Sequence, residues 1–148
     1  MKTNSRKTSS MRCLGNIDVI ELAEAVSEIP NSVWDIENTN KPNKFEALDK
    51  TKHIVFRFVK SMQSHQESYD LKLWADWSKL ILPVMEQATR SFGYARSDYP
   101  RIMLAKMDPG GVIYPHVDAS TSAGFPHKIH VPLLTNPKVE FYIEPNYY

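Results

Sequence analysis

The predicted fold depends most on residues 101–118, which read RIMLAKMDPGGVIYPHVD. Two runs with the composition of strands, 101–107 and 112–118, flank the turn sequence Asp108-Pro109-Gly110-Gly111. A type II turn favours proline and glycine at its two central positions, and they stand in that order here. Because runs of this kind on either side of a turn signal favour strand pairing, the stretch predicts two strands of an antiparallel sheet.

Strand character continues beyond this stretch and also appears once before it. Runs 128–134 and 139–144 are separated by a second turn sequence, Thr135-Asn136-Pro137-Lys138. Earlier in the chain, 53–59 is a short run dense in isoleucine, valine and phenylalanine, which is typical of a buried strand. The pattern therefore predicts about five strands, four of them consecutive.

Two earlier segments show the spacing of apolar residues that a helix requires. Residues 18–29 form the first, with Asp18 as its cap. Residues 74–92 form the second, and Gly93 ends it. Pro83 interrupts the second segment, so this helix either kinks at the proline or starts there.

Helices followed by an antiparallel sheet indicate an α+β domain whose sheet is a sandwich or jelly roll, with the N-terminal helices packed on it. The polar stretch 35–52 lies between the first helix and the first strand, and we expect a long surface loop there. Residues 1–12 are basic and rich in serine and threonine, which favours a disordered tail. Residues 13–148 are then left as one domain.

Composition and charge argue against several classes of function. The chain has 148 residues, of which 42% are hydrophobic, and a formal net charge of +1, so no strong field attracts nucleic acid. No apolar stretch approaches the roughly 20 residues of a membrane helix. Cys13 is the only cysteine and can form no internal disulfide, which fits a cytoplasmic protein. The expected partner is a small molecule or a protein side chain.

His116 and Asp118 are the first candidates for chemistry. They stand two residues apart on a predicted strand, so both side chains point to one face. One imidazole and one carboxylate are two of the three ligands of a 2-His-1-carboxylate iron site, which leaves positions open for O₂ and a chelating cosubstrate. The simpler alternative is an exposed strand end that carries a histidine–aspartate pair.

Lys128 and His130 share one face of the next predicted strand, while Ile129, Val131 and Leu133 share the other and are expected in the core. A lysine and an imidazole beside a metal strand suit a dicarboxylate, because the ammonium supplies a point charge and the ring a hydrogen bond. The alternative is a solvated strand face. Tyr114 is a further candidate, for substrate contact, although core packing explains it equally well. Arg101 is another, as a cation in the pocket, and its ordinary explanation is a charge at the start of a strand.

The run Phe125-Pro126-His127-Lys128-Ile129-His130-Val131-Pro132-Leu133-Leu134-Thr135-Asn136-Pro137, following His116-Val117-Asp118, resembles the aspartyl/asparaginyl β-hydroxylase family. The resemblance implies a double-stranded β-helix and a dioxygenase that uses Fe(II), 2-oxoglutarate and O₂. It implies iron ligation by His116 and Asp118 and cosubstrate contacts from Lys128 and His130. The implied reaction is hydroxylation of an amino acid or of an aspartyl, asparaginyl or prolyl side chain.

Two departures from the family pattern change the expectation. The family usually has arginine where this chain has Lys128. A lysine can still pair with a carboxylate, but it cannot make the two parallel hydrogen bonds that an arginine makes. The family also has a later strand with a distal iron-binding histidine, and the chain ends at Tyr148 before it. His53, His65 and His127 are poor replacements. We therefore expect a partial jelly-roll domain from a fragment or truncated relative, with impaired activity and self-association through the unpaired last strand.

Two other classes of function remain open. The first is a non-catalytic jelly-roll binding or assembly module derived from the same fold, which the missing third ligand favours. The second is a cupin-like metal protein, although cupins gather more histidines around the metal than this pair of strands supplies.

Overall fold

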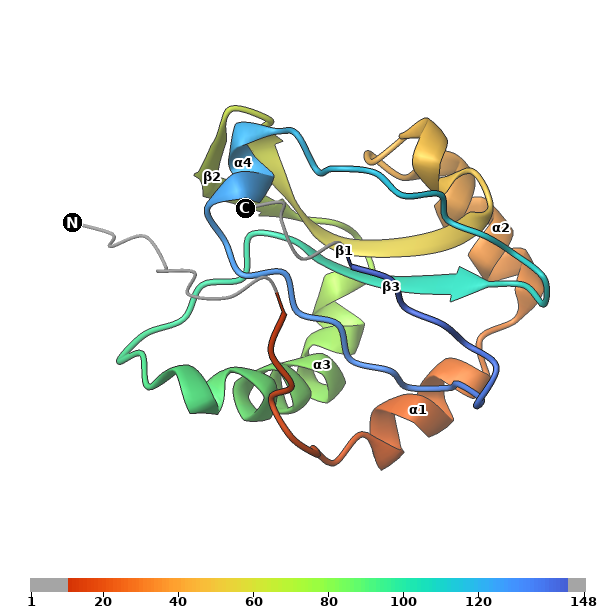
Figure 1. Cartoon of the computed structure of the whole chain (residues 1–148), viewed down its shortest axis with the longest axis horizontal. Helices are drawn as coiled ribbons and strands as arrows, with labels where there is room; N and C mark the ends of the chain where they lie inside the picture. The colour runs from red at the N-terminus through yellow and green to blue at the C-terminus, as the bar shows by residue number, and fades with distance from the viewer. Residues whose placement is uncertain (1–10, 144–148) are drawn as a thin grey trace.

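The computed structural model describes residues 11–143 and shows an α+β arrangement in which helices lie against a small sheet (Figure 1). In chain order the elements are α1 (Ile20–Ser27), α2 (Asn31–Asn40), the 3-10 helix η1 (Glu46–Leu48), β1 (Thr51–Ser61), β2 (Ser64–Asp70), α3 (Trp74–Thr89), the 3-10 helix η2 (Arg90–Phe92), β3 (Ile102–Met107) and α4 (Thr121–Gly124). The predicted α+β class is confirmed.

The sheet has three antiparallel strands in the order β2-β1-β3, so β1 is paired on both sides. Ile54 of β1 lies opposite Leu104 of β3, and Phe58 of β1 lies opposite Tyr69 of β2. Side chains on both faces of β1 are buried, which explains why 53–59 is almost continuously apolar. The predicted strand at 53–59 is confirmed as the centre of a longer one.

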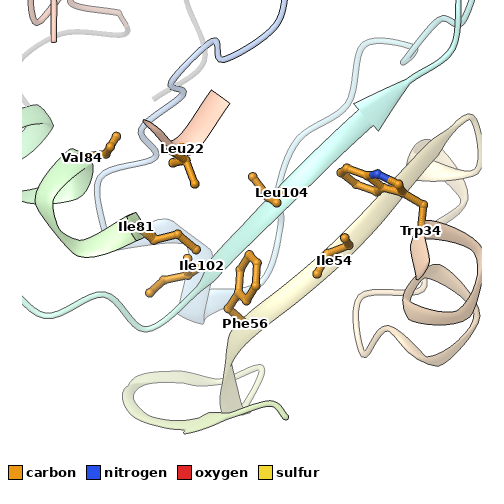
Figure 2. Close-up of a cluster of buried hydrophobic side chains, with 8 residues drawn as sticks. All are labelled: Leu22, Trp34, Ile54, Phe56, Ile81, Val84, Ile102 and Leu104. Carbon is orange, nitrogen blue, oxygen red and sulfur yellow. The ribbon is translucent and has the colours of Figure 1, made fainter. Parts of the chain in front are cut away.

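The main core lies between one face of the sheet and the helices. Figure 2 shows its buried side chains converging from α1, α2, α3, β1 and β3: Leu22, Trp34, Ile54, Phe56, Ile81, Val84, Ile102 and Leu104. Phe56 is fully buried, with its ring centroid 6.4 Å from that of Trp74 and 5.8 Å from that of Trp77. A smaller cluster of Val55, Phe58 and Val59 lies apart from it. The expectation that the N-terminal helices pack on the sheet is therefore confirmed.

Both predicted helices are present. α1 lies within 18–29, and a carboxylate oxygen of Asp18 accepts a hydrogen bond from the backbone N–H of Ile20 at 3.1 Å. α3 begins at Trp74 and continues through Pro83, so the alternative that this helix starts at the proline is wrong. Gly93 follows η2 with φ of 66°, the left-handed conformation in which glycine commonly ends helices.

The predicted surface loop at 35–52 is wrong in its first part, because α2 runs from Asn31 to Asn40 and η1 follows it. α2 is polar over most of its surface, and the indole of Trp34 is 3% exposed in the main core. One deeply packed aromatic residue anchors this helix. Of its polar residues Glu37 is buried and most of the others are exposed, so the segment carries no helical apolar pattern that sequence reasoning could detect.

The strand predictions in the second half are partly confirmed. The run 101–107 contains β3, and the N–H of Gly111 donates to the carbonyl oxygen of Asp108 at 2.9 Å. Gly110 has φ of 78°, as the third position of a type II turn requires. The second turn also forms, with the N–H of Val139 donating to the carbonyl oxygen of Asn136 at 3.1 Å.

The strands predicted at 112–118, 128–134 and 139–144 are wrong as far as the described residues reach, because those residues are irregular (Glu144 lies outside them). β2 is a polar strand that carries no apolar alternation, and pairing with β1 forms it. A jelly roll closes with about eight strands. With three strands among residues 11–143, the jelly roll stays a prediction. Residues 1–10 of the predicted tail also lie outside the described part of the chain.

Candidate functional site

The candidate residues lie directly before β3, at Arg101, and on the two irregular segments that follow this strand. After β3 and the turn at Gly110, the chain runs back along the sheet to α4 (Figure 1). The backbone N–H of Ser122 in α4 donates to the carbonyl oxygen of Met62 at 3.0 Å. This contact attaches the returning segment to the β1–β2 turn, and a hydrogen bond between Lys128 and Asp118 joins the two irregular segments.

The His116 ring has a defined orientation. Its Nδ1 lies 2.8 Å from the backbone carbonyl oxygen of Tyr114, and because a carbonyl can only accept, Nδ1–H is the donor. In the neutral ring Nε2 then carries the lone pair, and it lies 3.8 Å from Oδ1 of Asp118. Two electron-pair donors therefore face each other, as in a pair that could share a cation.

Lys128 is brought to the same carboxylate. Its ammonium donates a hydrogen bond to Oδ2 of Asp118, and 60% of the lysine side chain and 44% of the aspartate side chain are exposed. Desolvation alone would raise the pKa of Asp118. The hydrogen bond and charge of Lys128, together with the charges of His116 and Arg101, outweigh it and lower that pKa below its usual value.

His130 lies near this pair. Its pKa is lowered, first by desolvation and second by the charge of Lys128, while Asp118 opposes the shift. Its ring packs edge-on against Phe141 with 4.9 Å between the centroids. Burial alternates along residues 129–134, and Val131 and Leu133 pack on the main core. The predicted division of this segment into a core face and an outer face is confirmed, although no strand forms.

Arg101 is held by neutral groups. Its Nη2 donates to the hydroxyls of Ser122 and, at 3.5 Å, Ser120, and its Cζ lies 5.1 Å from the centroid of the Phe58 ring. Desolvation lowers the pKa of Arg101, and the negative charge of Asp118 partly offsets this. Sequence reasoning missed the two serines, because nothing in residues 119–125 distinguishes them from an ordinary polar loop.

The other candidates do not join the site. Tyr114 is 72% exposed, and it is its backbone carbonyl that contacts His116. His53 is buried beside Lys41, the His65 ring packs on Phe125, and Nε2 of His127 lies 3.0 Å from the Tyr94 hydroxyl. The expectation that these three histidines are poor replacements for a distal ligand agrees with these positions.

The residues present fit a divalent metal in part. An imidazole nitrogen and a carboxylate oxygen are ligands that Fe(II) accepts, and they face each other. Across residues 11–143, however, no group of three histidine, cysteine, aspartate or glutamate side chains is arranged to hold a metal. His116 and Asp118 are thus two candidate ligands without a third among the described residues. The side chains of Lys128 and Asp118 are 60% and 44% exposed, so the candidate site lies at the surface, and open hollows of about 570 and 290 Å³ lie elsewhere, against α1 and α2.

No protein-family model, curated protein or solved structure matches the chain. None of the described helices combines the length and the apolar character that crossing a bilayer demands.

Proposed function

We propose that this chain is related to the Fe(II)- and 2-oxoglutarate-dependent dioxygenases, and that it hydroxylates an amino acid or an aspartyl, asparaginyl or prolyl side chain with impaired activity. One observation supports this most strongly. Nε2 of His116 and Oδ1 of Asp118 face each other, with Nδ1 of the ring tied to a carbonyl, which is the arrangement that a metal-binding imidazole needs.

Each candidate residue has a proposed role. His116 and Asp118 hold Fe(II), which when bound supplies the activation of O₂ that such enzymes use. Lys128 offers its charge to the distal carboxylate of 2-oxoglutarate, and His130 orients the cosubstrate by a ring hydrogen bond. Two protein ligands hold a metal less firmly than three, and this is the reason that activity is impaired.

The proposed relationship to these dioxygenases also suggests a fold, a cellular location and a mode of self-association. A double-stranded β-helix is the expected complete fold, and the single cysteine, Cys13, favours a cytoplasmic location. Val139 and Phe141 are 50% and 61% exposed in the last described segment, so we expect this segment to promote self-association.

A non-catalytic binding or assembly module is the second candidate. Two observations favour it: the ammonium of Lys128 already occupies one oxygen of Asp118, and no third metal ligand is present among the residues that the structure describes. In that function the His116, Asp118 and Lys128 contacts only hold two irregular segments together.

Anaerobic addition of Fe(II) and 2-oxoglutarate separates the two functions. The dioxygenase proposal predicts the weak visible charge-transfer band of the ternary complex, and predicts its loss in His116→Ala. His65→Ala is the matched control, because that ring packs on Phe125 away from Asp118 and the band should persist. If the unmodified chain gives no band at saturating cosubstrate, the module is the better description.

A further inference from the structure

Among residues 11–143, the Arg101 guanidinium is held by uncharged groups and not by a counter-ion. Nη2 donates to the hydroxyls of Ser120 and Ser122, and it also lies 3.7 Å from the sulfur of Met62. The ring of Phe58 lies 5.1 Å from the guanidinium carbon. All four partners are uncharged, so they orient the cation but do not neutralise it.

Two nitrogens of this guanidinium have no hydrogen-bond partner among residues 11–143. Nε is buried and unpaired. Nη1 likewise makes no hydrogen bond within the described residues. A guanidinium that is anchored through one nitrogen and has donors left over at the others can still bind an acceptor.

The charge of Arg101 is also unmatched at close range. Within the described chain, no carboxylate lies at ion-pair distance from it: Asp118 acts on it electrostatically from farther away and is itself hydrogen-bonded to Lys128. A partly buried arginine normally has an anionic partner, because removing the cation from water is costly without one. A planar guanidinium matches a carboxylate better than any other common biological group except phosphate.

We propose that the unpaired donors of the Arg101 guanidinium bind the carboxylate of a small organic acid, either an amino-acid substrate or a 2-oxo dicarboxylate. Ser120 and Ser122, which anchor Arg101, follow Asp118 by two and four residues, so an acid held by Arg101 lies close to the segment that carries His116 and Asp118. The choice between these two ligands rests on the proposed function, whereas the existence of a carboxylate site does not.

The test is a titration of the full chain, without metal, monitored at the Nε–H signal of Arg101 in heteronuclear NMR. A carboxylate that binds this guanidinium should shift the signal in a saturable way. Succinate and 2-oxoglutarate represent the cosubstrate, L-proline and L-aspartate represent the substrate, and dimethyl succinate is the probe without a carboxylate. A shift with the dicarboxylates alone, or with the amino acids alone, supports the site and identifies its ligand.

Arg101→Gln should weaken the affinity for the active acid about tenfold, the typical effect of losing one charge-assisted contact. Arg96→Gln is the matched control, because Arg96 is exposed in the loop before β3 and should leave the affinity unchanged. If Arg101→Gln does not fold, the titration of the unmodified chain decides. The proposal is overturned if the signal does not move, or if chloride and dimethyl succinate move it as far as the acids do.

The two proposals can fail separately. A saturable shift at Arg101 together with no charge-transfer band rejects the dioxygenase and keeps the carboxylate site. A charge-transfer band without any shift at Arg101 supports the dioxygenase and rejects the carboxylate site.

Discussion

Nε2 of His116 lies 3.8 Å from Oδ1 of Asp118, while the other nitrogen of the ring is occupied by the carbonyl oxygen of Tyr114. This distance exceeds hydrogen-bond range, so the two atoms are close without being bonded to each other. Their separation and the ring tautomer make this pair the most informative target for mutation.

Removing either ligand should reduce the affinity for a divalent metal. We expect His116→Ala and Asp118→Asn each to weaken the binding of Co(II), a spectroscopic substitute for Fe(II), by about tenfold or more, since even groups that only support metal ligands are worth 10–100-fold. Absorption titrations measure this. Asp49→Asn, on the exposed surface after η1, should bind Co(II) like the unmodified chain. Equal affinities for all four proteins would place the metal elsewhere.

Lys128→Met should strengthen metal binding and weaken dicarboxylate binding. The lysine ammonium competes with a metal for the Asp118 carboxylate, and two unit charges near 4 Å in water interact by about 1 kcal/mol, which corresponds to about fivefold in affinity. Calorimetry with Co(II) and then with 2-oxoglutarate measures both effects. Lys138→Met, a change at an exposed turn lysine, should alter neither. Weaker metal binding in Lys128→Met would show that the lysine supports the site instead of competing.

Stability should depend on pH through His53. Burial, and then the charge of Lys41, lower the pKa of His53 from 6.5 to about 4. Lys41 Nζ lies 3.0 Å from Nδ1, and Nε2 lies 3.4 Å from the Thr51 hydroxyl, which itself donates to the carbonyl oxygen of Leu48. In a neutral ring with the proton on Nε2, Nδ1 accepts from the Lys41 ammonium and Nε2–H donates to the Thr51 hydroxyl, so the folded state favours the neutral form.

The unfolded chain therefore takes up a proton near pH 6.5 that the folded chain resists until about pH 4. The contribution of His53 to stability is complete above pH 6.5 and is lost as the pH falls through about 4, with a slope of at most about 1.4 kcal/mol per pH unit. Urea unfolding across this range should show that slope, and His53→Gln should reduce it. His65→Gln should retain the slope; identical slopes in all three proteins would exclude His53 as the source.

Gly110→Ala should destabilise the fold by about 1 kcal/mol, because φ of 78° is unfavourable for any residue with a Cβ. A Cβ at Gly110 meets no atom within 4 Å, so the cost is conformational and not steric. Gly124→Ala is the matched control: it also has free space but lies in α4 with ordinary φ, and it should be neutral or slightly stabilising. The difference in urea midpoint between the two variants measures the strain.

Phe56→Ala should cost about 3–5 kcal/mol, since the ring is fully buried between Trp74 and Trp77 and its loss leaves a cavity in the main core. Phe45→Ala removes the same ring from a site that is 46% exposed and should cost much less. Tryptophan fluorescence during urea unfolding monitors both. A small effect at Phe56 would mean that the β1–α3 packing contributes little to stability.

Local chemistry explains which elements the sequence predicts well. β1 follows from a continuous apolar run, the end of the second helix from Gly93, and the turn after β3 from the order of proline and glycine at 109–110. α2 was missed because Trp34 is its one fully buried apolar residue and its other residues are mostly polar, and β2 was missed because its side chains are polar. In both cases packing or pairing with a distant segment outweighs the local pattern.

By itself the sequence determined that His116 and Asp118 stand near each other, that Lys128 and His130 are displayed away from Val131 and Leu133, and that the segment with His116 follows a strand and a tight turn. These properties depend on spacing along an extended chain, which periodicity encodes. Only the tertiary structure decided that residues 112–118 and 128–134 stay unpaired, that Lys128 reaches Asp118, and that Ser120 and Ser122 orient Arg101. An alternating pattern specifies which face of a segment is buried, whereas its hydrogen-bond partners come from residues far away in the chain.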